Sequence, residues 1–182
     1  MIGWIIGGIV LVLILVFFVG TFNKFVGLRN GIDNTFNQIK VAMKKRADMI
    51  GQLVDTTSSY LKFEKATLEG VTKMRQMSMD NVSSLNEADA TARSVFGNIV
   101  AVAENYPKLK AVETVKPLQE GIKSLEEEIS RMRYLYNDQV QTFNNMAEKV
   151  PTNLVAGILG YKKKEYLKFE EGIEKRPDTK VF

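Results

Sequence analysis

Apolar residues are gathered without interruption at the start of the chain. Residues 2–22 contain no charged side chain, and a helix of that length, rising about 1.5 Å per residue, spans a bilayer core of roughly 30 Å. In lipid, a helix satisfies its backbone hydrogen bonds within one segment. A cleaved signal peptide is the alternative, but no Lys or Arg precedes the run, and residues 17–21 make a poor cleavage site. The pattern therefore predicts a transmembrane anchor at residues 1–23.

Two kinds of residue in the anchor carry specific hypotheses. Trp4 lies near one end, where an aromatic ring suits the membrane interface. Gly3 and Gly7 have the GxxxG spacing that lets two membrane helices approach and dimerise, although glycine is also simply common in such helices. A homo-oligomer is therefore an expectation that the sequence leaves open. The anchor residues singled out are Gly3, Trp4, Gly7, Gly8, Phe17 and Phe18.

The clearest helical pattern lies in the last third of the chain. Apolar residues recur there mostly in steps of 3 and 4, which draws one stripe along about nine turns of helix. Pro117 suits a first helical turn, and Pro151 stops the helix at its far end. The stripe consists of Leu118, Ile122, Leu125, Ile129, Met132, Tyr136, Val140, Phe143, Met146 and Val150.

A shorter stripe precedes this one. Its small residues would let a neighbouring helix pack closely, and Pro107 ends it. Ser84 and Glu87 have the spacing of a capping box, so we expect Ser84 to be the N-cap. The stripe consists of Ala88, Ala92, Val95, Ile99, Val102 and Tyr106.

The stretch between the anchor and residue 80 allows two interpretations, one helix of nearly sixty residues or two shorter helices. Gly51 and the weak helix formers at residues 56–59 favour a kink or turn, and therefore two helices. The apolar stripe consists of Ile32, Phe36, Ile39, Met43, Ile50, Leu53 and Thr57, continued by Leu61, Leu68, Val71 and Met74.

Together these patterns predict an all-α protein in which a transmembrane helix precedes an antiparallel four-helix bundle at residues 24–151. A sustained heptad seam would also permit a coiled-coil oligomer. The varied core residues, which include Phe, Met, Tyr and Ala, favour a globular bundle. Residues 152–182 form a C-terminal tail, expected to dock on the bundle or on the membrane surface.

Flanking charge predicts the orientation of the anchor. No Lys or Arg lies on its N-terminal side, whereas Lys24 and Arg29 follow it closely. The positive-inside rule then places the N-terminus outside and the C-terminal domain in the cytoplasm.

Composition narrows the function. The chain contains no histidine and no cysteine, which excludes Ser-His-Asp triads, Cys nucleophiles, thiolate or imidazole metal sites, and disulfides. Neither GxxxxGK[ST] nor GxGxxG is present. The net charge of +4 is mild, and no long basic stripe suits nucleic acid. We therefore expect no enzymatic activity, no cofactor, no metal and no nucleic-acid partner.

Several motifs occur in a fixed order along the chain. They are Phe25-Val26-x-Leu28-Arg29-Asn30, Lys44-Lys45-Arg46-Ala47-Asp48-Met49-Ile50, Tyr106-Pro107-x-Leu109-Lys110-Ala111, Tyr136-Asn137 and Pro151-x-Asn153-x-x-Ala156. This ordered set resembles the LemA family over nearly the whole chain. The resemblance implies a single-pass protein with a cytoplasmic antiparallel four-helix bundle and no established catalytic activity. Some relatives are associated with membrane-organelle formation or envelope function, which suggests scaffolding.

Five polar residues within these motifs are candidate structural positions. Arg46 with Asp48 is expected to help fix the bundle, and Tyr136 with Asn137 to form a polar core network that sets helix register. Arg29 completes the set. The basic run at residues 44–46 could bind anionic lipid, but a solvated or paired helix face is the favoured interpretation.

The tail carries the remaining candidate site. An apolar, glycine-containing stretch is followed by lysines interleaved with aromatic residues, a combination that suits a membrane surface. The alternative, which we favour, is that the segment docks its apolar residues on the end of the bundle. The candidate membrane-surface residues are Tyr161, Lys162, Lys163, Lys164 and Tyr166.

The sequence thus favours a membrane-tethered, non-enzymatic scaffold or adaptor that presents its bundle to protein partners as yet unknown. The alternative is direct membrane organisation through the anchor and the basic-aromatic tail.

Overall fold

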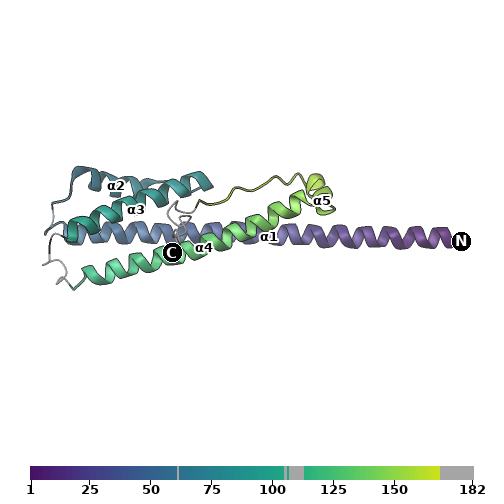
Figure 1. The fold of residues 1–182 in the computed structure, drawn as a ribbon, viewed down its shortest axis with the longest axis horizontal. Helices are drawn as coiled ribbons and strands as arrows, with labels where there is room; N and C mark the ends of the chain where they lie inside the picture. Colours follow the sequence, from purple (N-terminus) through teal and green to yellow (C-terminus); the bar gives the residue numbers. More distant parts are fainter. Residues whose placement is uncertain (61, 105, 107–112, 169–182) are drawn as a thin grey trace, which may run out of the picture.

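The computed structural model describes residues 1–60, 62–104, 106 and 113–168, and every regular element in these ranges is a helix. Leu61 and Pro107, to which the sequence patterns assign roles, lie outside the described residues, as do Leu109, Lys110 and Ala111 of the ordered motifs. The expected all-α architecture is confirmed. Helices α1 to α4 run alternately up and down and pack as an antiparallel bundle (Figure 1).

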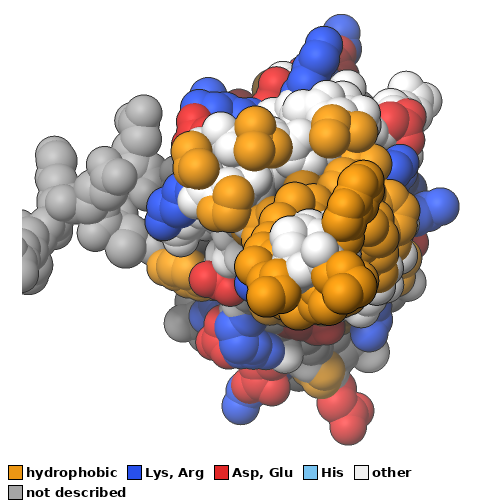
Figure 2. Space-filling model, turned by 90° about the vertical axis from the view of Figure 1, so that its right-hand side faces the viewer, with side chains coloured by type: hydrophobic (Ala, Val, Ile, Leu, Met, Phe, Trp, Pro, Cys, Tyr) orange, Lys and Arg blue, Asp and Glu red, His pale blue; other side chains and the backbone are white. Residues whose placement is uncertain are grey.

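Helix α1 (Ile2–Thr57) joins the anchor to the bundle without a break. Its apolar first part is long enough to cross a membrane and projects from one end of the bundle (Figure 1). Seen end-on, this part is a ring of hydrophobic side chains (Figure 2). Residues 2–17 are all exposed, Phe18 is half-buried, and Phe25 is fully enclosed by the bundle core. The apolar segment and the first bundle helix are therefore one continuous helix.

The helix is interrupted between residues 57 and 65, so residues 24–80 contain two helices. The weak helix formers at residues 56–59 indicate this interruption. The Thr57 hydroxyl donates to the Leu53 carbonyl oxygen at 2.6 Å, within the last turn of α1. Gly51, by contrast, lies inside continuous helix. The guanidinium of Arg75 rests against it where a Cβ would otherwise stand, so this glycine permits a close side-chain approach.

Helix α2 (Lys65–Gln76) is short and packs against α3 (Val82–Glu104). The buried face of α2 contains Thr67, Val71 and Met74, and Leu68 points to solvent, because a break in the helix resets the stripe that the sequence continued from α1.

The start of α3 differs from the expected capping box. Helix α3 begins before Ser84, and Asn81 caps it: the Ser84 N–H donates to Asn81 Oδ1 at 2.8 Å, and the Asn81 N–H donates to Ser84 Oγ at 3.2 Å. Glu87 instead forms a surface ion pair with Lys73 at 3.2 Å. Asn-x-x-Ser satisfies the first N–H groups as well as Ser-x-x-Glu does, and one turn earlier.

Helix α4 (Val115–Glu148) packs along α1 over most of its length and is the other long wall of the bundle. Pro117 lies in its first turn and Pro151 follows its end, as expected. The apolar stripe of α4 faces the core between residues 122 and 143, and Val150, beyond the helix, is exposed.

The chain then turns into α5 (Thr152–Leu159), which ends at Gly160 in the left-handed conformation, where glycine has no Cβ penalty. From there residues 161–168 run extended along the bundle, away from the projecting part of α1 (Figure 1). Val155, Ala156 and Leu167 are buried in the core. The first part of the C-terminal tail is therefore built into the bundle.

The core consists of two apolar clusters, one nearer the anchor and one farther away. Helices α1, α3 and α4 contribute to both. In the far cluster the fourth partner is α2, which contributes Val71 and Met74. In the near cluster that place is taken by α5 and residue Leu167 of the extended segment. Because α2 has only 12 residues, the tail completes the bundle where α2 does not reach.

Candidate functional site

A buried carboxylate, Asp89 on α3, lies at the boundary between the two core clusters. Arg46 of α1 places Nη2 2.6 Å from Asp89 Oδ1, and Arg133 of α4 places Nη2 2.5 Å from Asp89 Oδ2. Arg93, one turn along α3, brings Nε within 3.0 Å of Asp89 Oδ2. Arg46 is 2% exposed and Asp89 is 5% exposed, so the group is desolvated. Three helices are thus joined through one carboxylate.

The positive charge of this group is partly offset by a second acid nearer the surface. Arg93 Nη1 lies 3.1 Å from a carboxylate oxygen of Glu126 on α4. Burial would raise the pKa of Asp89, but the facing guanidinium groups of Arg46 and Arg133 outweigh it and hold that pKa below its ordinary value of 3.8. Asp89 is therefore ionised at neutral pH. Its two carboxylate oxygens bind α1 and α4 in a fixed register against α3.

Arg46 was expected to act with Asp48, but the acid that contacts Arg46 is Asp89, forty-three residues away, and Asp48 is exposed. Residues two apart on a helix point to different sides, whereas Arg46 faces the core. The rest of the basic run is split around α1. Lys44 and Lys45 are exposed on the rims of separate surface pockets.

A second set of polar contacts fastens the extended tail to α4. Asn144 accepts from the Lys164 N–H at 2.9 Å and donates to the Lys164 carbonyl oxygen at 3.0 Å. Two turns earlier, Asn137 does the same for Leu167, at 2.9 Å and 2.8 Å. Each side-chain amide pairs with one backbone residue as a neighbouring strand would. The two asparagines therefore act as clamps on residues 164–167.

Tyr136 and Arg133 extend this contact. The Tyr136 hydroxyl donates to the Glu165 carbonyl oxygen at 3.3 Å, and Arg133 Nη1 donates to the Lys168 carbonyl oxygen at 3.3 Å. Burial, with the nearby charges of Asp33 and Glu165, raises the pKa of Tyr136. Tyr136 and Asn137 do belong to one polar network, as the sequence suggested, but what the network holds is the tail. Arg133 links it to Asp89.

The predicted membrane-surface residues divide into two groups. The Tyr161 ring packs on Phe25 and Phe143, at centroid distances of 5.2 and 5.5 Å. Lys164 Nζ lies 3.5 Å from Asp33 Oδ1 and over the ring of Phe143. The side chains of Tyr161 and Lys164 thus contact residues of the bundle. The remaining three, Lys162, Lys163 and Tyr166, are exposed, and Lys163 pairs with Glu148.

The other sequence candidates, with the exception of Phe18, lie on exposed surfaces. Arg29 and Asp33 form a solvent-exposed pair one turn apart on α1, at 3.9 Å. The glycines Gly3, Gly7 and Gly8 have open space around them, so dimerisation of the anchor stays a prediction. Trp4 and Phe17 are exposed on the projecting helix, whereas Phe18 packs against the near core cluster.

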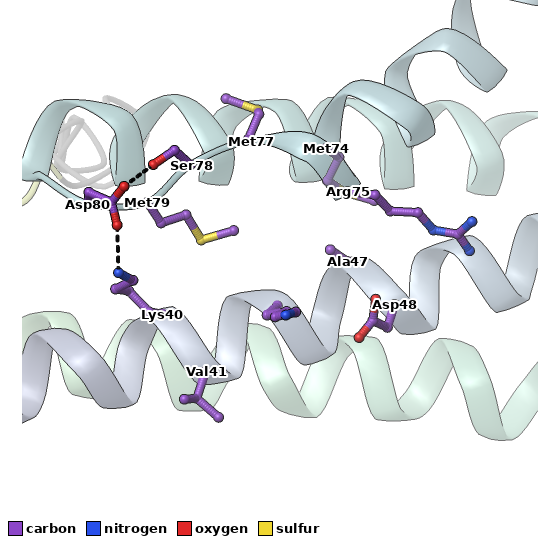
Figure 3. A pocket seen from close by; sticks show the side chains of 11 residues that line it. Lys40, Val41, Ala47, Asp48, Met74, Arg75, Met77, Ser78, Met79 and Asp80 are labelled. Carbon is purple, nitrogen blue, oxygen red and sulfur yellow. Dashed lines mark hydrogen bonds and ion pairs between the residues drawn. The ribbon is translucent and has the colours of Figure 1, made fainter.

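A surface pocket of about 320 Å³ lies between α1 and the chain that connects α2 to α3 (Figure 3). At one end Lys40 Nζ is 3.0 Å from Asp80 Oδ1. Met77 and Met79 line the opposite wall, and Val41 lies at the rim, where a second groove between α1 and α4 begins. Within the described residues, no group of three or more metal-binding side chains is assembled. Both hollows are lined by a mixture of apolar and charged side chains.

Comparison with known proteins identifies the family. Residues 35–181 match the model of the LemA family, which is more than half of the chain. The chain belongs to the LemA family. Among its relatives are the magnetosome protein MamQ 2 of Paramagnetospirillum magneticum, 25% identical over 87% of this chain and 70% of that protein. Protein LemA of Metamycoplasma hominis is 29% identical over 76% of this chain and 65% of that protein.

Three key residues of this LemA-family chain were missed by sequence reasoning: Asp89, Arg133 and Asn144. Neither Asp89 nor Arg133 falls on the apolar stripe of its helix, so the helical pattern alone does not place either residue in the core. A signal was nevertheless present, because Asp89 directly follows Ala88 of the α3 stripe and Arg133 directly follows Met132 of the α4 stripe. Asn144 likewise follows Phe143. Polar residues adjoining a core stripe can be drawn into the interior when they find a partner.

Proposed function

We propose that this protein is a membrane-tethered, non-enzymatic scaffold that presents a helical-bundle surface to protein partners. The observation that carries this proposal is the continuity of α1, which leads from the apolar segment into the bundle core without a linker. A rigid connection holds the bundle at a set height and orientation relative to the bilayer. A docking surface held in this way meets membrane-bound partners at a defined position, whereas a domain on a flexible linker samples many positions.

The surface best suited to docking surrounds Val41 on α1. This apolar side chain is 70% exposed and lines both the pocket against residues 74–80 and the groove between α1 and α4. Lysines and acids border both hollows, so a partner would meet an apolar centre with a charged rim. That combination is typical of protein interaction surfaces.

The scaffold proposal predicts partner crosslinks at this surface. A photo-crosslinking residue placed at Val41 in the full chain, in native membranes, is expected to give a discrete adduct identified by mass spectrometry. The same probe at Leu68 on α2 and Leu135 on α4, both exposed, maps the extent of the face. The control is the anchor fused to an unrelated helical domain. Adducts no different from those of this control would contradict the scaffold function.

The orientation of the anchor is the second element of the proposal. Because the chain contains no cysteine, a single Asn30→Cys substitution provides a unique thiol on an exposed face of α1. If the bundle is cytoplasmic, a membrane-impermeant maleimide is expected to label this thiol only after cell lysis. Labelling in intact cells, at the extent reached in lysed cells, would reverse the orientation.

Direct membrane organisation is a second candidate function, favoured by the exposed cations Lys162 and Lys163 at the end of the bundle from which α1 projects. Replacing Lys162 and Lys163 with glutamate tests whether their positive charge contributes to membrane organisation. If this function is correct, the variant alters membrane morphology or protein clustering in cells while the anchor stays inserted.

A further inference from the structure

The membrane segment and the bundle overlap along α1. The charge-free run continues to Phe22, and the first charged residue of the chain is Lys24. Packing against the bundle nevertheless begins earlier, since Phe18 joins the near core cluster and Thr21 is buried. The shared residues, 18–22, cover about 7 Å of helix. The end of the bundle therefore lies at the depth where the apolar part of α1 meets the membrane interface.

Helix α5 is the element beside α1 at this level. It contacts α1 and lies at the end of the bundle from which the anchor projects (Figure 1). Its inner face, with Val155 and Ala156, is buried in the near core cluster.

The outer face of α5 is apolar and uncovered. Leu154 and Ile158, one turn apart on α5, are 66% and 73% exposed, and Val150, which precedes the helix, is 79% exposed. The end-on view of Figure 2 shows hydrophobic side chains beside the ring of α1 on this end of the molecule. Charges occur only around this face: Lys149 precedes α5, and Lys162 follows it. An apolar face bordered by lysines is the pattern of a helix that lies in a membrane interface.

We propose that α5 is an interfacial membrane helix, whose Leu154 and Ile158 side chains, together with Val150 just before the helix, enter the leaflet that α1 crosses on the bundle side. The lipid-facing surface of α1 continues onto this face, because Val19 and Phe22 of the overlapping stretch are also exposed. An interfacial helix buries its apolar face about 5–10 Å into the headgroup and acyl boundary, which agrees with the overlap of about 7 Å.

A protein partner fits this face less well than lipid does. A stable protein interface takes about 20–30 residues from each side, whereas the outer face of α5 and Val150 before it offer three large side chains. A bilayer imposes no such minimum, and α1 already brings it into place.

The consequence is a second point of attachment. A single membrane helix leaves the bundle free to rotate about the helix axis and to tilt. Because α5 lies on one side of α1, its insertion fixes which face of the bundle points along the membrane and which points away. This orientation does not rest on the scaffold function and would hold whether or not the protein shapes the bilayer.

The test uses the full chain in phosphatidylcholine–phosphatidylglycerol vesicles. Leu154→Cys and Ile158→Cys each provide a unique thiol for the fluorophore NBD, because the chain has no cysteine. The matched control is Val41→Cys, which is equally apolar and exposed but lies 19 residues beyond Phe22, about 28 Å along α1. For NBD at residues 154 and 158 we expect blue-shifted emission that brominated lipid quenches and aqueous iodide does not. For NBD at residue 41 we expect emission without a blue shift that iodide quenches and brominated lipid does not.

The other outcomes overturn the proposal. If iodide quenches NBD at 154 and 158 as it does at 41, the face is exposed to water. If NBD is protected from iodide without being quenched by brominated lipid, protein covers the face, as in a dimer. In a second variant, Leu154→Asp with NBD at 158, we expect the lipid quenching to be lost while the helical circular dichroism is unchanged. Retained quenching in this variant also contradicts insertion of α5. None of these readouts depends on a partner, so they fail or succeed separately from the crosslinking test.

Discussion

The Asp89→Asn substitution is expected to destabilise the bundle by about 3–5 kcal/mol, the cost of leaving buried charges without their counter-ion. Arg46 and Arg133 are 2% and 3% exposed, and both direct a guanidinium group at this one carboxylate. Asparagine keeps the shape of the side chain but removes its charge. The effect should be measured by denaturant unfolding of the full chain in detergent, followed by circular dichroism.

The matched control is Asp55→Asn, the same chemical change in an exposed ion pair. Asp55 lies 3.6 Å from Arg75, and both side chains are well exposed to water. Pairs of this kind contribute about 0–1 kcal/mol, so the control should unfold nearly as the natural chain does. Equal effects of the two substitutions would contradict the assignment of Asp89 as the central counter-ion of the core.

The same carboxylate predicts the direction of the pH dependence. The pKa of Asp89 in the folded state is below its ordinary value of 3.8, so the unfolded chain binds the proton more readily. The stabilisation from Asp89 is therefore complete above that ordinary value and is lost as the pH falls through the lower folded-state pKa. Asp89→Asn should remove this part of the acid sensitivity, and Asp55→Asn should retain it.

An apolar replacement of the whole group separates charge from packing. In the triple variant Asp89→Leu, Arg46→Met and Arg133→Met no buried charge is left unpaired, and buried ion pairs often give way to apolar residues without net loss. We expect this variant to recover most of the stability that Asp89→Asn loses. If the triple variant is less stable than Asp89→Asn, the stability lost in Asp89→Asn does not come from an uncompensated buried charge.

Removing the two asparagine clamps is expected to release the extended tail. Asn137→Ala with Asn144→Ala deletes four hydrogen bonds to the backbone of Lys164 and Leu167. At about 1 kcal/mol each, they contribute about 4 kcal/mol to docking, or roughly a thousandfold in the docking equilibrium. The reporter is Leu167→Cys, a thiol at a position that is buried when the tail is docked. Its maleimide labelling rate should rise by about that factor.

Asn145→Ala is the control for this experiment. Asn145 neighbours Asn144 on α4 but is exposed, so its replacement should leave the labelling of the residue 167 thiol unchanged. If the double variant labels no faster than this control, apolar packing of the tail holds it in place and the clamps do not.

The elements of the fold were largely predictable because their signals are local. The stripe of α4 and the break after Thr57 follow from residues within a few turns of one another. The cap of α3 was placed one turn late, since Asn81-x-x-Ser84 and Ser84-x-x-Glu87 overlap and either could satisfy the helix start. The two core clusters were not predictable, because α2 and the tail fill equivalent places in different halves of the bundle.

The sequence by itself determined the apolar segment, the helical class and the face of each long helix that is buried, because charge-free length and residue period act within one element. Only the tertiary structure decided which residues of different elements contact one another. Asp89 meets Arg46 and Arg133 because three helices pack at one register, and the amides of α4 meet the tail because the chain reverses at Gly160. The helical period of the sequence tells which way a side chain points, but it does not tell which residue of another helix lies opposite. That choice depends on packing, which no local pattern contains.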